Sequence, residues 1–167
     1  AWYQTGYCYG VLGRHNEALK ASRQAAKLRP EWAPVFVNIG TSSYALGQYR
    51  EAVDAYKQAI RLDDDNAEIQ YSLGLTFGKM NRMDEEILAY RRAIALKPDH
   101  VNSIERLGLV LFKQRRFADS AAAFDSLKAY RPDARTYNYL GESLLETGKA
   151  DDSIEAFNAA LGYNPNL

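Results

Sequence analysis

The chain has 167 residues, of which 47% are hydrophobic and 25% are charged, and its formal net charge is +0. This balance is ordinary for a soluble globular chain and argues against a nucleic-acid partner, whose phosphates require a clustered basic excess. The single cysteine, Cys8, cannot form an internal disulfide. Apolar runs of about 18 residues, the length of a membrane span, are missing, so no membrane insertion is expected. The chain begins without Met, and we expect it to be a piece of a longer protein.

Apolar residues recur at helical spacing along the whole chain and predict about ten helices, paired into five hairpins. The expected helices span residues 1–12, 15–28, 33–46, 49–62, 67–80, 83–96, 101–114, 117–130, 134–147 and 150–163. Short turns such as Leu46-Gly47-Gln48 join the two helices of a hairpin. Prolines close several second helices, because proline disfavours helix in the residue before it. Asp65-Asn66 and Asp99-His100 are suited to starting the helices that follow.

The chain repeats itself with a period of 34 residues. One column of this repeat is Gly6, Gly40, Gly74, Gly108 and Gly141; a second is Pro30, Asp64, Pro98, Pro132 and Pro165; a third is Ala25, Ala59, Ala93, Leu127 and Ala160. The last step is 33 residues, so one residue is missing between Pro132 and Gly141. We therefore expect a single array with repeats at about 1–32, 33–66, 67–100, 101–133 and 134–167.

The repeated glycine lies inside the first helix of each hairpin, where it costs about 1 kcal/mol relative to alanine. Its recurrence indicates that the second helix passes too close for a Cβ. The small residues predicted to face it are Ala18, Ala52, Ser120 and Ser153. Glu86 takes this position in the third copy. Either its side chain reaches water or an arginine such as Arg82, or it marks a polar pocket that opens toward a groove in which a partner binds.

These residues resemble a known family, the tetratricopeptide repeats, whose pattern is W-x₂-L-G-x₂-Y…A-x₃-F…P at a 34-residue period. The pattern reads here as Trp2, Gly6, Tyr9, Ala18 and Pro30, then as Phe36, Ile39, Gly40, Ala52 and Tyr56, and again as Tyr137, Leu140, Gly141, Phe157 and Pro165. Essentially the whole chain resembles five such repeats. The resemblance implies an all-α fold, a right-handed α-solenoid of antiparallel helix hairpins. In such a superhelix the first helices line a concave groove.

The groove side of each first helix can be located from the spacing of about 100° per residue. Relative to the glycine, offsets −4, −1, 0 and +3 face neighbouring helices, and offsets −6, −3, −2, +1, +4 and +5 face the other way. The residues predicted to bind a partner are Tyr3, Tyr7, Asn38, Thr41, Tyr44, Tyr71, Leu75, Lys79, Asn102, Arg106, Leu109, Phe112, Lys113, Asn138 and Glu142. The face grades from an aromatic zone (Tyr3, Tyr7, Tyr44 and Tyr71), through a cationic zone (Lys79, Arg106 and Lys113), to an acidic zone (Glu142 and Glu146). The alternative is that some of the aromatic rings pack against the adjacent repeat.

No group of residues predicts catalysis, a metal site or a cofactor. His15, His100 and Cys8 are too few and too far apart for a zinc site or an activated nucleophile. The run Lys113-Gln114-Arg115-Arg116 is expected to be a solvated turn rather than a phosphate site. The stretch SLGLTFGKM, residues 72–80, resembles a phosphate loop, but Gly74 is a helix glycine. Gly78, whose column otherwise holds larger residues in most copies, should leave a dent in the groove.

The sequence therefore predicts a non-catalytic scaffold that binds a peptide or protein segment in its groove. Among groove types known in the family, an asparagine ladder is represented here by Asn38 alone, and a carboxylate clamp is incomplete. One alternative is the substrate-recognition arm of a larger enzyme such as a glycosyltransferase. The other is a scaffold that self-associates end to end through uncapped terminal repeats.

Overall fold

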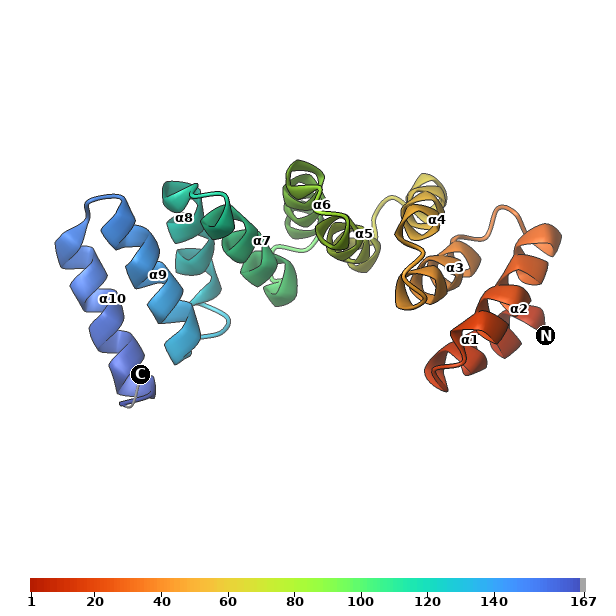
Figure 1. The fold of residues 1–167 in the computed structure, drawn as a ribbon, viewed down its shortest axis with the longest axis horizontal. Coiled ribbons are helices and arrows are strands. Elements are labelled where there is room, and N and C mark those ends of the chain that lie inside the picture. Colours follow the sequence, from red (N-terminus) through yellow and green to blue (C-terminus); the bar gives the residue numbers. More distant parts are fainter. Residues whose placement is uncertain (166–167) are drawn as a thin grey trace. The chain divides into compact units, whose positions relative to one another are not determined.

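The computed structural model describes residues 1–165, and these form ten helices. Their bounds are α1 Trp2–Val11, α2 His15–Leu28, α3 Ala33–Ala45, α4 Tyr49–Leu62, α5 Ala67–Lys79, α6 Met83–Leu96, α7 Val101–Lys113, α8 Phe117–Leu127, α9 Ala134–Glu146 and α10 Ala150–Tyr163. The prediction of an all-α chain of helix hairpins is confirmed (Figure 1). None of the described helices combines the length and apolarity needed to cross a membrane.

The chain divides into two compact units, with the boundary between Leu96 and Lys97. The first unit contains three hairpins, α1/α2, α3/α4 and α5/α6, and the second contains α7/α8 and α9/α10. Within each unit the second helix of one hairpin packs on the first helix of the next, as α2 does on α3 and α8 on α9. Each unit is thus a short stack of hairpins, and the single array over both units stays a prediction.

The predicted helix ranges agree with the structure to within about two residues, except at the end of α8. The prediction extended this helix to residue 130, but it ends at Leu127. Beyond it the backbone tightens, because Tyr130 N bonds to Leu127 O, three residues back, at 3.0 Å. This tighter turn immediately precedes the place where the repeat is one residue short.

Side chains cap three of the first helices. Asn66 Oδ1 accepts from the backbone N–H groups of Glu68 and Ile69, and His100 Nδ1 accepts from Ser103 N at 3.2 Å. The predicted helix starts at Asn66 and His100 therefore agree with these caps. Asp133, which was not predicted as a cap, accepts from Thr136 N at 2.8 Å.

The turn inside each hairpin uses one left-handed residue. These residues are Gly13, Gly47, Asn81, Arg115 and Gly148, with φ between 58° and 78°. They recur at the repeat spacing, so the same turn is built in every described hairpin. Glycine adopts this conformation freely, whereas Asn81 tolerates it and Arg115 is strained. The run at 113–116 is therefore the end of α7 and a tight turn.

The close approach at the repeated glycine is confirmed, but its main cause differs from the prediction. A Cβ on Gly74 would lie 2.5 Å from Tyr90 Cε1, and one on Gly108 would lie 2.8 Å from Phe124 Cε2. The same holds for Gly40 against Tyr56 and Gly141 against Phe157; on Gly6, a Cβ would meet Ser22 Oγ and the Ala18 carbonyl. An aromatic ring, four residues beyond the predicted small residue, excludes the Cβ in these later copies.

The two serines among the predicted small residues bond to the backbone instead. Ser120 Oγ donates to Gly108 O at 3.1 Å, and Ser153 Oγ donates to Gly141 O at 2.9 Å. Ser120 Oγ also shares a hydrogen bond of 3.0 Å with Ser143 Oγ of α9. The two bonds to Gly108 O and Gly141 O hold the second helix of each hairpin against a carbonyl of the first.

Candidate partner-binding surface

The face predicted to bind a partner is open in both units. Among the described residues of the first helices, none at offsets −6, −3, −2, +1, +4 or +5 from the glycine is buried. At the glycine itself every copy is buried, and at offset −1 every copy except Thr5 is buried. The helical-spacing argument therefore assigned the exposed side correctly. Lys79 belongs to the first unit, whereas Arg106 and Lys113 belong to the second.

Three of the four tyrosines of the aromatic zone contact other rings in the first unit. Tyr3 lies 4.4 Å from Trp32 between ring centroids, and Tyr44 lies 5.7 Å from Tyr49. Tyr71 lies 5.9 Å from the buried ring of Tyr90. Each of these contacts joins residues of one predicted repeat, so none of them shows the expected packing against the adjacent repeat, and the three rings remain half-buried. Tyr7 is 57% exposed and leaves most of its ring open.

Polar groups gather beside this aromatic zone on α3. Thr41 Oγ1 and the Tyr56 hydroxyl lie within hydrogen-bond distance at 3.2 Å. Burial raises the pKa of Tyr56 above its ordinary value, so its hydroxyl stays protonated. Asn38 is half-buried, and its Nδ2 has no hydrogen-bond partner among the described residues. α3 therefore holds one amide donor that its own unit does not satisfy.

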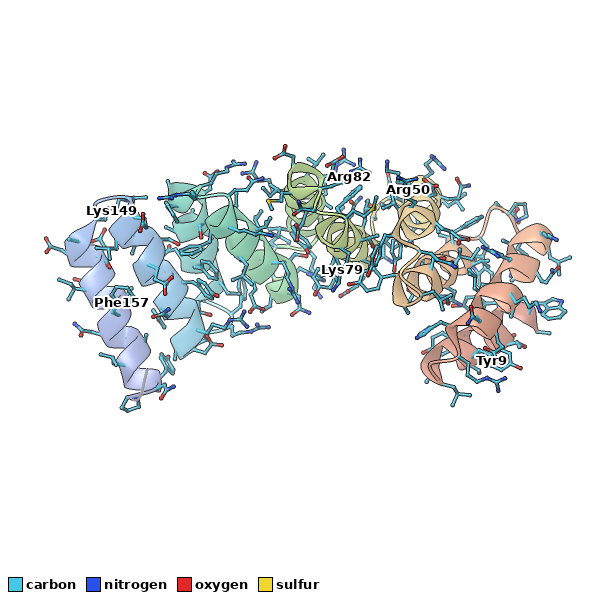
Figure 2. The ribbon with its side chains drawn as sticks, viewed as in Figure 1. Tyr9, Arg50, Lys79, Arg82, Lys149 and Phe157 are labelled. Carbon is cyan, nitrogen blue, oxygen red and sulfur yellow. The ribbon has the colours of Figure 1, made fainter. Side chains whose placement is uncertain are left out.

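The predicted cations are exposed. Lys79, Arg106 and Lys113 make no ion pair or side-chain hydrogen bond within the part of the chain that the structure describes. Lys79 lies at the end of α5, and Arg82 follows in the turn to α6 (Figure 2). Arg82 pairs with Glu85 instead of extending the cationic zone.

Several acidic and amide groups on this face of the second unit have partners, whereas Glu146 is exposed and has none among the described residues. Glu105 holds Arg131 at 2.6 Å and Arg135 at 3.1 Å. Asn102 Oδ1 accepts from Arg131 Nη2 at 3.4 Å. Asn138 Nδ2 donates to Glu142 Oε1 at 2.6 Å, which satisfies part of the predicted acidic zone.

The apolar members of the predicted face are half-buried. Phe112 lies 5.3 Å from Phe117 and 5.6 Å from Tyr139 between ring centroids. Leu75 and Leu109 expose part of their side chains in the first and second unit, respectively. The face therefore offers apolar patches between its polar groups.

The dent predicted at Gly78 is filled by the protein itself. A Cβ on Gly78 would lie 2.7 Å from Glu86 Oε1, so the carboxylate of α6 occupies the space. The Tyr90 hydroxyl donates to the same oxygen at 3.2 Å. The long side chain at the small-residue position thus packs over the neighbouring glycine, and the expectation of an open dent was wrong.

A cavity of about 590 Å³ lies elsewhere in the second unit, among α8, α9 and α10. We call it the alanine cavity, because its walls include Ala118, Ala121, Ala122, Ala156 and Ala159. None of the residues predicted to bind a partner lines it. The sequence signal that would have found it is the replacement of larger residues by alanine in several repeat columns at once.

The described residues contain no cluster of three or more His, Cys, Asp or Glu that could hold a metal ion. Cys8 is exposed on α1, His15 begins α2 and His100 is the buried cap of α7. Cys8 and His15 belong to the first unit, whereas His100 belongs to the second.

Comparisons with known proteins agree with the geometry. Profiles described as tetratricopeptide repeat match residues 1–31, 67–100 and 105–166, and one described as TPR repeat matches residues 40–81. Among curated proteins, no sequence matches significantly.

Solved structures share the fold at low sequence identity. A crystal structure of MamA protein is 23% identical, with a TM-score of 0.88, covering 98% of this chain and 90% of that one. YrrB, described as a TPR protein with an unusual peptide-binding site, is 17% identical, with a TM-score of 0.85, covering 99% of this chain and 86% of that one. With matching profiles along most of its length and five helix hairpins in its described residues, the chain belongs to the tetratricopeptide repeat family.

Proposed function

We propose that the chain is a scaffold that binds an extended or helical segment of a partner protein on the exposed face of its first helices. The observation that carries this proposal is a set of free cations on that face. Lys79 in the first unit, and Arg106 and Lys113 in the second, have no partner among the described residues, while Glu105 pairs with Arg131 and Arg135. Glu142 bonds to a neutral amide and Glu146 is exposed, so the second unit carries both signs on this face. The free cations favour a segment with acidic residues opposite them.

The uncharged groups of the face suit the backbone of such a segment. Asn38 has an unsatisfied amide donor, which a backbone carbonyl of the bound segment would satisfy. The exposed ring of Tyr7 offers a large, rigid contact area with a polar tip. YrrB, a solved structure of the same fold, is described as having a peptide-binding site, which supports a peptide as the kind of partner. We assign no catalytic residue to the chain.

The test is selection of peptides from a random display library on the purified chain, followed by affinity measurements on the selected peptides. We expect enrichment of acidic residues among apolar ones. The triple variant Lys79→Glu, Arg106→Glu and Lys113→Glu should weaken binding at least about tenfold, since each charged contact contributes about 1 kcal/mol or more. The matched control reverses three exposed cations of the second helices: Lys27, Arg50 and Arg92.

The control variant should bind as the unmodified chain does. We call the chain with Lys79, Arg106 and Lys113 reversed the groove variant. Equal affinities of the selected peptides for the groove variant and for the unmodified chain would refute an acidic partner on this face. Selection of basic peptides, which bind the groove variant more tightly than the unmodified chain, would refute it as well.

A further inference from the structure

The alanine cavity lies on the side of α9 opposite to the proposed groove. Tyr137, Leu140 and Leu144 form its floor, at offsets −4, −1 and +3 from Gly141. Asn138 and Glu142 point to the other side at −3 and +1. Leu140 is 5% exposed, so the floor reaches the core of the second unit. The cavity is thus a surface separate from the one that carries the proposed function.

The cavity exists because side chains that fill the equivalent space in other hairpins are truncated here. At the positions of Ala118, Ala121 and Ala122, α2 has Asn16, Leu19 and Lys20, and α4 has Arg50, Val53 and Asp54. Ala159 likewise stands where α2 and α4 have Gln24 and Gln58. On α2 the corresponding pocket is smaller, about 330 Å³, and Leu19, Lys20 and Arg23 line it.

A cation is missing from the same place. In the first unit, Arg23 Nη2 of α2 lies 2.6 Å from Glu51 Oε1 of α4, an ion pair that joins two successive second helices. The equivalent positions in α8 and α10 are Asp125 and Asp152, and both line the cavity. A cation–carboxylate pair is therefore replaced by two carboxylates across the cavity.

The remaining charges at the rim do not compensate for this loss. Lys128 Nζ lies 2.5 Å from Asp125 Oδ1 and neutralises that carboxylate alone. Within the described residues, the side chains of Lys149, Asp152 and Glu155 make no ion pair or hydrogen bond.

Lys149 and Asp152 differ in this respect from their repeat equivalents. Arg116 and Asp119, at the same two positions in the second unit's other hairpin, pair at 2.5 Å. Lys149 lies at the start of α10 (Figure 2), and it leaves Asp152 unpaired. Asp152 and Glu155, three residues apart, share one face of α10 and present two unneutralised carboxylates.

We infer that the alanine cavity binds an arginine side chain carried by an apolar segment of a partner protein. The aliphatic stem covers Leu140 and Leu144, and the guanidinium meets Asp152 and Glu155, as Arg23 meets Glu51 in the first unit. The planar guanidinium suits two carboxylates better than an ammonium does, because it offers several donors in a fixed fork. A volume of about 590 Å³ exceeds that of one arginine, so apolar neighbours of the arginine enter as well.

The experiment titrates the isotopically labelled chain with the blocked peptide Leu-Arg-Leu and follows backbone amide shifts. We expect shifts at Leu140, Leu144 and residues 152–156. The same peptide with citrulline, which keeps the shape of arginine without its charge, should bind about tenfold more weakly. A peptide with Glu in place of Arg should cause no shift at these residues.

Two variants fill the cavity from within. Asp125→Arg restores the cation found on α2, and Ala121→Leu restores Leu19 of the first copy. Each should remove the arginine-dependent shifts while the circular dichroism spectrum stays unchanged. The matched control is Asp151→Asn, an exposed acid of α10 outside the cavity lining, and it should bind as the unmodified chain does.

Persistent shifts in both filled variants would overturn the inference, and so would the absence of shifts at millimolar peptide. Equal binding of the arginine and citrulline peptides would do the same. The groove variant with Lys79, Arg106 and Lys113 reversed should bind the arginine peptide normally, so failure of this inference and failure of the proposed function can be told apart.

Discussion

The hairpins α5/α6 and α7/α8 have the same backbone plan but fill one position in opposite ways. In α5/α6, Gly78 has no side chain, and the Glu86 carboxylate occupies the space beside it. In α7/α8, the equivalent residues are Phe112 and Ser120: the first helix supplies a ring and the second a small hydroxyl. The two hairpins thus take the bulk at this position from different helices, from α6 in one and from α7 in the other. The α1/α2 hairpin takes it from neither, since a Cβ on Gly10 would meet nothing within 4 Å.

The largest expected effect removes the volume that α7 supplies. Phe112→Ala should lower the free energy of unfolding by about 2 to 3 kcal/mol, since the half-buried ring loses its contacts with Phe117 and Tyr139. The matched control is Leu145→Ala in α9, the same repeat column, where the side chain is 54% exposed. Its cost should stay below about 1 kcal/mol. Urea denaturation measures both, and equal losses would contradict the role of Phe112.

The next effect separates the two glycines of α5. Gly74→Ala should cost about 2 kcal/mol, because its Cβ would meet the ring of Tyr90, which is fully buried and cannot move aside. Gly78→Ala meets the flexible end of Glu86 instead. In a Glu86→Ser background it should stabilise the chain by about 1 kcal/mol through helix propensity, and by less when Glu86 is present. A double-mutant cycle that finds no coupling between positions 78 and 86 would show that the carboxylate does not fill the space.

A smaller effect concerns a polar residue in the core of the first unit. Gln70 is 4% exposed and its Oε1 has no partner among the described residues, whereas Ile104 stands in the same column of α7. Gln70→Ile should therefore stabilise the chain by about 1 to 2 kcal/mol. The reverse exchange, Ile104→Gln, should destabilise it. Thermal unfolding measures both; a loss of stability in Gln70→Ile would indicate that the amide has a partner in solution.

The smallest effect compares the turns of the two hairpins. Arg115 and Asn81 have φ of 59° and 58°, in a column that otherwise holds glycine. Arg115→Gly should stabilise the chain by about 0.5 to 1 kcal/mol after the loss of its contact with the Phe117 ring. Asn81→Gly should change stability by only about 0.3 kcal/mol, since asparagine tolerates this conformation. The same denaturation measurement orders the two, and a larger gain for Asn81→Gly would reverse the argument.

The helices and the exposed face could be predicted because they depend on local spacing. A glycine, a proline and an alanine column in register over the whole chain fix the ends of most helices, and helical geometry then fixes which side is buried. The end of α8 was not predicted, because the tight turn from Leu127 to Tyr130 continues the helical spacing of the sequence without continuing the helix.

The errors concern contacts between helices. The column pattern identified the glycines that need space, but not that the rings of Tyr90 and Phe124 fill it, because those rings lie one turn away from the predicted small residues. The dent at Gly78 was misjudged for the same reason: a residue on α6 decides whether it is open. The alanine cavity is lined by residues of three helices, so no single repeat column predicts it.

The hydroxyl of Ser120 links three helices of the second unit, since it bonds to Gly108 O of α7 and to Ser143 Oγ of α9. If α9 separated from α8, Ser143 would lose this buried partner, and the loss would raise the free energy of local opening. Amide hydrogens of α7, α8 and α9 should therefore exchange with solvent as one cooperative group. In that case a partner that grips any one of these helices would slow exchange in all three.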